Sequence, residues 1–157
     1  MIKVLIIDDE PLQRQGIVRM TPWTDFDAEV VGDTGSGMEG ILLARRLRPD
    51  VLIVDIKMPG ISGLEVIEQL RGEIDAEYII LSGYGEFEFA QQAIALGVCA
   101  YLLKPLDDEE LAAAMKEGAE RIYRRRARAE ETQEERDGRP TIRIPQEEPG
   151  RGYLLHA

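Results

Sequence analysis

The stretch VLIVDIKMP, residues 51–59, decides how this chain folds. Its first four residues are apolar, and such a short apolar run predicts a strand buried on both faces rather than a helix. The strand leads directly into Asp55. Open α/β folds place their chemistry at the carboxyl ends of buried parallel strands. We therefore expect Asp55 at a functional edge of a sheet.

The same kind of apolar segment occurs four more times along the chain. Strands are predicted at residues 3–7, 29–32, 78–81 and 100–103, in addition to 51–54. Helical patterns follow them, at residues 11–20, from 35–40 to just before Pro49, at 64–70, around 89–96, and from Asp107 or Asp108 to about Tyr123. Strands that alternate with helices favour crossover units. The predicted fold class is α/β, with a five-stranded parallel sheet and helices on both faces.

The apolar pattern ends near Tyr123, and the stretch RRRARAEETQEERDGRP that follows is almost entirely charged. It lacks heptad leucines, so it predicts either a solvated continuation of the last helix or a linker rather than a coiled coil. We expect one domain over residues 1–123 and a charged linker and tail over residues 124–157.

Composition limits the classes of partner. The formal net charge of −11 disfavours a general nucleic-acid or membrane surface. The one cysteine, Cys99, excludes an internal disulfide and suits a reducing compartment. No apolar run is long enough for a signal peptide or a membrane span. We expect a cytoplasmic protein that does not bind membranes.

Polar side chains stand at the carboxyl ends of four predicted strands, and parallel strands bring those ends to one edge of the sheet. The residues are Asp8, Asp9, Asp55, Ser82 and Lys104. Three crowded carboxylates repel one another, so a divalent cation is the natural means of keeping them ionised. Oxygen ligands without nearby histidine or cysteine favour Mg²⁺ over zinc.

This set of residues suits phosphoryl chemistry. Asp55 is placed to act as a carboxylate nucleophile that becomes an acyl phosphate. Mg²⁺ and the Lys104 ammonium group would neutralise the phosphoryl oxygens, and the Ser82 hydroxyl would donate a hydrogen bond to one of them. A phosphoryl group adds a charge of about −1.5 to −2, which gives Ser82 and Lys104 a new partner. The pattern therefore indicates a switch that phosphorylation of Asp55 controls.

Four motifs together resemble the receiver domain of two-component response regulators: DDE at 8–10, DIKMPGISG at 55–63, SGYGEFEFA at 82–90 and YLLKP at 101–105. The resemblance covers about residues 2–123. It implies a flavodoxin-like, doubly wound sheet with strand order 2-1-3-4-5 and a cis bond between Lys104 and Pro105. It also implies that the chain is not an enzyme in the ordinary sense, although it assists its own phosphorylation and dephosphorylation.

The resemblance also implies residue roles. Asp55 would accept the phosphoryl group from a sensor histidine kinase. Asp9, Asp55 and the backbone carbonyl of Lys57 would hold Mg²⁺, with Asp8 acting largely through water. Tyr101 matches the aromatic switch position that responds when Ser82 engages the phosphoryl group.

Trp23 and SGYGEFEFA are similar to receivers attached to AraC-type helix-turn-helix transcription regulators. That similarity implies a transcriptional output, and DNA contact only through an output domain that residues 1–157 do not contain. Homodimerisation on phosphorylation is expected, with signalling through the fourth helix, fifth strand and fifth helix.

Alternative interpretations stay open for several of these residues. Residues 35–40, GSGMEG, match a dinucleotide-binding fingerprint, although the glycines are explained more simply by a tight turn at a helix start. Asp8-Asp9-Glu10 also suits a helix N-terminus, and Ser82 a helix cap. The chain as a whole could alternatively be a Mg²⁺-dependent aspartyl-phosphate phosphohydrolase, or a phosphorylation-independent pseudo-receiver that acts as a dimerisation module.

Overall fold

The computed structural model describes residues 1–83 and 87–138. Strands and helices alternate as the sequence predicts, in the order β1 (Ile2–Ile7), α1 (Pro11–Met20), η1 (Trp23–Phe26), β2 (Ala28–Thr34), α2 (Gly37–Leu47), β3 (Val51–Asp55), α3 (Gly63–Leu70), β4 (Glu77–Ser82), α4 (Phe87–Ala95), β5 (Ala100–Leu103) and α5 (Asp108–Arg136). Residues 84–86 of the SGYGEFEFA motif and the tail from residue 139 lie outside the described residues.

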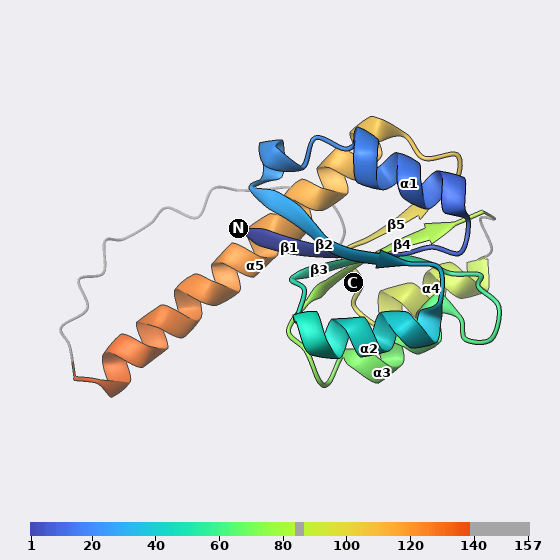
Figure 1. The fold of residues 1–157 in the computed structure, drawn as a ribbon. Coiled ribbons are helices and arrows are strands. Elements are labelled where there is room, and N and C mark those ends of the chain that lie inside the picture. Colours follow the sequence, from blue (N-terminus) through green and yellow to red (C-terminus); the bar gives the residue numbers. More distant parts are fainter. Residues whose placement is uncertain (84–86, 139–157) are drawn as a thin grey trace.

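The five strands form one parallel sheet in the order β2-β1-β3-β4-β5, which confirms the expected topology. Figure 1 shows α1 and α5 on one face of the sheet and α2, α3 and α4 on the other. The sheet lies between two helical layers, so its central strands are protected from water on both sides.

Each face of the sheet has its own apolar cluster, because successive strand side chains point to opposite faces. From β3, Leu52 and Val54 pack with α2 and α3, whereas Val51 and Ile53 pack with α5. All five residues of β3 are buried. Burial on both faces explains why the strand is uninterruptedly apolar up to Asp55.

Two segments between α1 and α2 differ from the sequence-based boundaries. The strand expected at residues 29–32 extends over Ala28–Thr34, and Trp23–Phe26, which lies between a predicted helix and a predicted strand, forms a short 3-10 helix. The Trp23 indole Nε1 donates a hydrogen bond of 3.0 Å to the carbonyl oxygen of Val18. This bond ties η1 back to α1.

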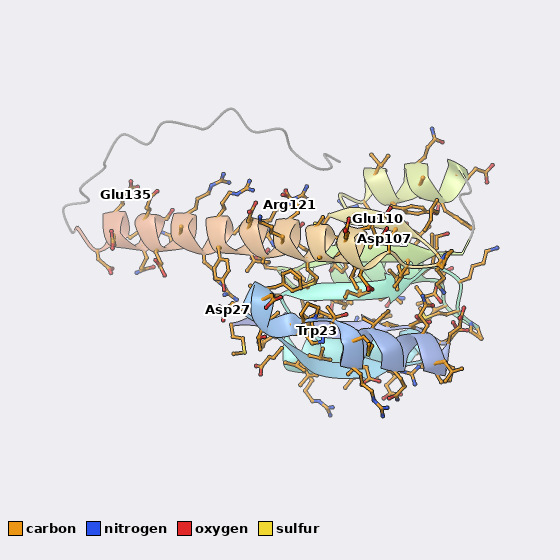
Figure 2. All side chains as sticks on the ribbon, turned by 90° about the horizontal axis from the view of Figure 1, so that it is seen from above. Trp23, Asp27, Asp107, Glu110, Arg121 and Glu135 are labelled. Carbon is orange, nitrogen blue, oxygen red and sulfur yellow. The ribbon has the colours of Figure 1, made fainter. Side chains whose placement is uncertain are left out.

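Helix α5 continues past Tyr123 to Arg136, so the charged residues up to Arg136 prolong the helix, which is one of the two forms that the sequence allowed. Figure 2 shows α5 running beyond the end of the sheet, with Glu135 near its far end. Asp107 caps the start of α5 by accepting from the backbone N–H groups of Glu109 and Glu110. The charged residues support the helix through pairs one turn apart, such as Arg121 with Glu117 at 3.1 Å.

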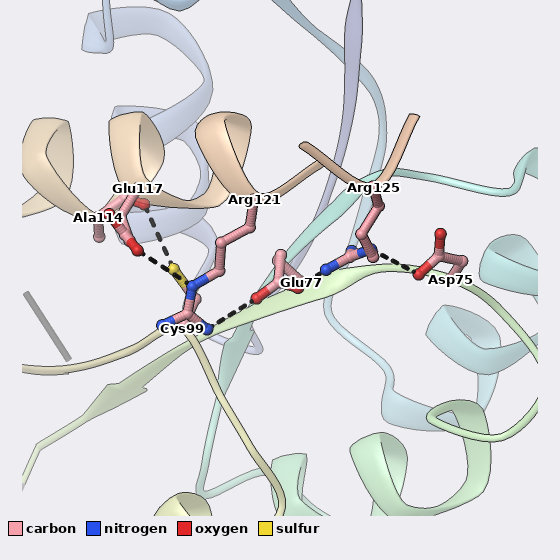
Figure 3. A network of polar contacts seen from close by, with 7 residues as sticks. All are labelled: Asp75, Glu77, Cys99, Ala114, Glu117, Arg121 and Arg125. Atoms are coloured by element: carbon pink, nitrogen blue, oxygen red, sulfur yellow. Dashed lines mark hydrogen bonds and ion pairs between the residues drawn. The ribbon is translucent and has the colours of Figure 1, made fainter. Parts of the chain in front are cut away.

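Arginines in the middle of α5 bind the amino-terminal end of the sheet. Glu77, the buried first residue of β4, forms ion pairs with Arg121 at 3.1 Å and with Arg125. Arg125 also pairs with Asp75 at 2.9 Å, and this network is drawn in Figure 3. Arg126 pairs with Asp50 at 2.8 Å. The helix is thus fixed to the sheet through residue 126, at the end opposite Asp55.

Candidate functional site

The site lies where the carboxyl ends of the strands meet. Asp8 and Asp9 follow β1, and Asp55 is the last residue of β3, the strand next to β1. One carboxylate oxygen from each of these three residues lies within 4.8 Å of the other two. Asp8 and Asp55 are buried and Asp9 is half-buried. The convergence expected from the sequence is therefore present.

The main chain and side chain of Asp8 are held by three hydrogen bonds. Its N–H donates to the carbonyl oxygen of Thr34 at 3.0 Å, and its own carbonyl oxygen accepts from Arg14 Nη1 at 2.5 Å. Its Oδ1 accepts from the N–H of Glu10 at 2.9 Å. The buried Oδ2 has no hydrogen-bond partner among the described residues. A buried carboxylate oxygen without a donor is suited to a cation.

Lys104 supplies the positive charge of the site. Its Nζ lies 3.1 Å from Asp55 Oδ2 and 3.1 Å from Glu10 Oε1. The contact with Asp55 joins β5 to β3 across the intervening strand β4. The second contact gives Glu10 a role that the sequence did not reveal, because the DDE pattern suggested only a favourable charge at the start of α1.

Burial and mutual repulsion perturb the pKa values of the carboxyl groups. Desolvation by burial and, to a smaller extent, the charge of Asp8 together raise the pKa of Asp55 to about 7, despite the hydrogen bond from Lys104. Desolvation also raises the pKa of Asp8. For Lys104, burial lowers the pKa, but the hydrogen bonds to Asp55 and Glu10 outweigh it and the net shift is upward. The protein alone therefore does not keep Asp55 fully ionised at neutral pH.

The donor set fits a hard divalent cation. It consists of carboxylate oxygens, and it includes the Oδ2 of Asp8, which has no hydrogen-bond partner among the described residues. Mg²⁺ takes oxygen ligands and commonly uses one or two carboxylates while keeping several waters. The residues present therefore suit Mg²⁺.

Ser82 lies at the end of β4, Tyr101 lies in β5, and Lys57 lies in the loop that follows β3. Ser82 is the last residue of β4 and is buried. The residue before it, Leu81, is in register with Asp55 of β3. Tyr101 in β5 is half-buried and packs against the cluster on the α2–α3 face. Lys57 is exposed, and its Nζ lies 5.8 Å from the centre of the Phe89 ring. Their roles in switching and metal binding stay predictions.

The glycines of the GSGMEG segment have packing roles. A Cβ on Gly37 would lie 2.4 Å from Ile61 Cγ2, and one on Gly40 would lie 2.5 Å from Ile7 Cδ1. These glycines let α2 approach β1 and the loop before α3. Close packing explains the pattern without a dinucleotide.

The bond between Lys104 and Pro105 is cis, as the resemblance implied. Among the described residues, none of the helices has the length and apolar character needed to cross a membrane.

Comparison with known proteins assigns the fold and the site to one family. Residues 4–116 match the response regulator receiver domain. The transcriptional regulatory protein BtsR of Escherichia coli K12 is 43% identical over 111 residues, which cover 71% of this chain and 45% of that protein. The uncharacterized transcriptional regulatory protein YesN of Bacillus subtilis 168 is 35% identical over 118 residues, which cover 74% of this chain and 32% of that protein.

A solved structure of a receiver domain also matches this chain. The receiver domain of AraT, a response regulator from Geobacillus stearothermophilus, matches with a TM-score of 0.74 and 40% identity, over 79% of this chain and 97% of that one. The chain spans less than half the length of the two curated relatives. Since the family match covers most of the chain and both the strand order and the acidic edge agree with it, the chain belongs to the response regulator receiver domain family of two-component systems.

Proposed function

We propose that Asp55 is the phosphoacceptor of this receiver and takes its phosphoryl group from a sensor histidine kinase in a Mg²⁺-dependent reaction. The observation that carries the proposal is the contact of Asp55 with Lys104 at 3.1 Å within the cluster of three carboxylates. A buried carboxylate beside a cation-binding set and a lysine has what an in-line phosphoryl transfer requires.

In the transfer, one carboxylate oxygen of Asp55 forms a bond to phosphorus. The bond between phosphorus and the kinase histidine nitrogen breaks, and the imidazole leaves with the electron pair and takes up a proton. Mg²⁺, when bound by Asp8, Asp9, Asp55 and the Lys57 carbonyl, supplies the charge that keeps the carboxylates ionised and neutralises the phosphoryl oxygens. Lys104 adds a further positive charge beside Asp55.

The acyl phosphate would then act through Ser82 and Tyr101. Ser82 is buried at the end of β4, and Tyr101 lies in the neighbouring strand β5, in register with Ile80. A hydrogen bond from Ser82 to the phosphoryl group would draw the β4 end towards Asp55 and change the space open to the Tyr101 ring. The same pocket would assist hydrolysis of the acyl phosphate, so the domain controls its own phosphorylation lifetime.

The output would pass through the face formed by α4, β5 and α5. Ile94 and Leu103 are apolar side chains on this face that are 47% and 48% exposed. Phosphorylation-dependent homodimerisation through such a face would bring two output domains together. The two curated relatives described above are transcriptional regulators. As a response regulator receiver domain, the chain would work in the cytoplasm and contact DNA only through an attached output domain.

The test is phosphorylation by acetyl phosphate, with Asp55→Asn compared to Asp25→Asn. Asp25 is an exposed carboxylate in η1, so its variant controls for the loss of one acidic group. We expect hydroxylamine-sensitive labelling of wild type and Asp25→Asn, no labelling of Asp55→Asn, and none in EDTA. Equal labelling of the three proteins would remove Asp55 from this role.

Beryllofluoride binding separates the receiver from the pseudo-receiver interpretation. We expect wild type to bind this phosphoryl mimic in the presence of Mg²⁺ and to increase in mass towards a dimer in analytical ultracentrifugation. A protein that neither binds beryllofluoride nor accepts a phosphoryl group would be a pseudo-receiver. Rapid steady turnover of phosphomonoesters would instead favour the phosphohydrolase.

A further inference from the structure

Arg14 connects three parts of the molecule at the edge of the acidic site. It lies in the second turn of α1, with a side chain that is 16% exposed. Its Nη1 donates to the carbonyl oxygen of Asp8 at 2.5 Å, and its Nε forms an ion pair with Asp33 Oδ1, in β2, at 3.0 Å. The planar guanidinium group therefore bridges α1, the loop after β1 and the end of β2.

The carbonyl that Arg14 holds belongs to the peptide bond between Asp8 and Asp9. The orientation of this peptide sets the direction in which the Asp9 side chain leaves the backbone. From the other side, the Asp8 N–H is held by Thr34 and the Asp8 Oδ1 by the Glu10 N–H. Arg14 adds a further restraint on the peptide bond that links Asp8 to Asp9.

The space around Arg14 is also restricted. A Cβ on Gly35 would lie 2.9 Å from Arg14 Nη1 and 3.6 Å from the Asp9 Cα. Glycine at position 35 leaves the guanidinium group the room it needs beside the acidic loop. This gives Gly35, one of the glycines in the GSGMEG segment, a role next to the site.

We propose that Arg14 is a positioning residue for the divalent cation, which sets the Asp8–Asp9 peptide so that both carboxylates reach a cation together with Asp55. The inference rests on the proposed Mg²⁺ site. Arg14 acts through the backbone and makes no contact with the ion. The charge of Arg14 is balanced by Asp33. The positioning effect therefore depends on the guanidinium group donating in two fixed directions, to the Asp8 carbonyl and to Asp33, and a lysine side chain does not reproduce this geometry.

The test measures Mg²⁺ binding to the unphosphorylated protein by isothermal titration calorimetry. Outer-shell partners of metal ligands typically change affinity by about 10- to 100-fold, and we expect Arg14→Ala and Arg14→Lys to weaken Mg²⁺ binding by roughly tenfold. Arg19→Ala is the matched control, because it removes an exposed positive charge from the same helix. We expect the control to bind Mg²⁺ as wild type does.

A second variant disturbs the same contact without removing Arg14. Gly35→Ala places a methyl group against the guanidinium, and we expect it to weaken Mg²⁺ binding. Gly72→Ala, where a Cβ meets nothing within 4 Å, should have no effect on binding. The acetyl phosphate reaction gives an independent readout. We expect Arg14→Ala to raise the Mg²⁺ concentration for half-maximal labelling while the rate at saturating Mg²⁺ recovers to near wild type.

The possible failures are distinguishable. If wild type neither binds Mg²⁺ nor accepts a phosphoryl group, the proposed function itself is wrong. If wild type does both, and Arg14→Ala and Gly35→Ala bind Mg²⁺ with wild-type affinity, the positioning role is wrong. An equal loss of labelling rate at every Mg²⁺ concentration would show a general structural defect and would also overturn the positioning role.

Discussion

The arginine network of α5 leads to a quantitative prediction about stability. Glu77 is buried at the start of β4, with a side chain only 8% exposed, and its charge is balanced by Arg121 and Arg125. Replacing both arginines with methionine keeps most of the apolar volume but leaves a buried carboxylate without a cation. Breaking a buried ion pair in this way costs about 3–5 kcal/mol of unfolding free energy.

Urea unfolding followed by circular dichroism measures this cost. We expect Arg125→Met to cost about 1–2 kcal/mol, because Glu77 keeps Arg121 as its cation. Arg121→Met should cost more, because it also leaves the buried Glu117 without its partner. The double variant should lose at least about 3–5 kcal/mol, and adding Glu77→Gln should restore the part of the loss that the uncompensated Glu77 charge causes. Figure 3 shows the contacts that these substitutions remove.

The matched control is Arg124→Met, on the same helix. Arg124 is 38% exposed and pairs with Glu120 at 3.7 Å, so its loss should cost less than about 0.5 kcal/mol. The reasoning is refuted if the double variant is no less stable than two such surface substitutions, or if adding Glu77→Gln restores none of the lost stability. The same argument predicts that a chain cut at residue 116, where the family match ends, is severely destabilised.

Three further predictions concern other groups. The pKa of Asp55 is about 7 in the folded protein, against an ordinary value of 3.8. Between these two pH values the folded state binds more protons than the unfolded state, so the free energy of unfolding of the metal-free protein falls as the pH rises from 3.8 to about 7. Asp55→Asn should reduce this fall in unfolding free energy between pH 4.5 and pH 8 by on the order of 2–4 kcal/mol, as measured by urea unfolding at the two pH values. An unchanged pH dependence in the variant would contradict the raised pKa of Asp55. Burial raises the pKa of the Cys99 thiol to about 12, so maleimide should label it slowly in the folded protein and rapidly in urea; fast labelling of the folded protein would disprove its burial. A Cβ on Gly63 would lie 2.3 Å from the Asp55 carbonyl oxygen, so Gly63→Ala should displace the loop after β3 and lower both thermal stability and Mg²⁺ affinity, whereas Gly72→Ala should change neither.

Much of the fold and the central part of the site follow from the sequence alone. The uninterrupted apolar run before Asp55 predicts a strand buried on both faces, and alternation with helices predicts parallel strands. Parallel strands share one carboxyl edge, so the convergence of Asp8, Asp9, Asp55 and Lys104 follows from chain order without knowledge of any side-chain contact.

The tertiary structure alone decided which side chains complete the site and where helix α5 is fixed to the sheet. Arg14 reaches Asp33 across 19 residues of sequence, and Arg126 reaches Asp50 across 76. Periodicity and local motifs do not encode such pairs, because they depend on how each helix packs onto the sheet. For the same reason, the sequence predicted only a solvated helix or a linker for the charged residues after Tyr123, whereas docking of α5 turns Arg125 and Arg126 back towards buried carboxylates.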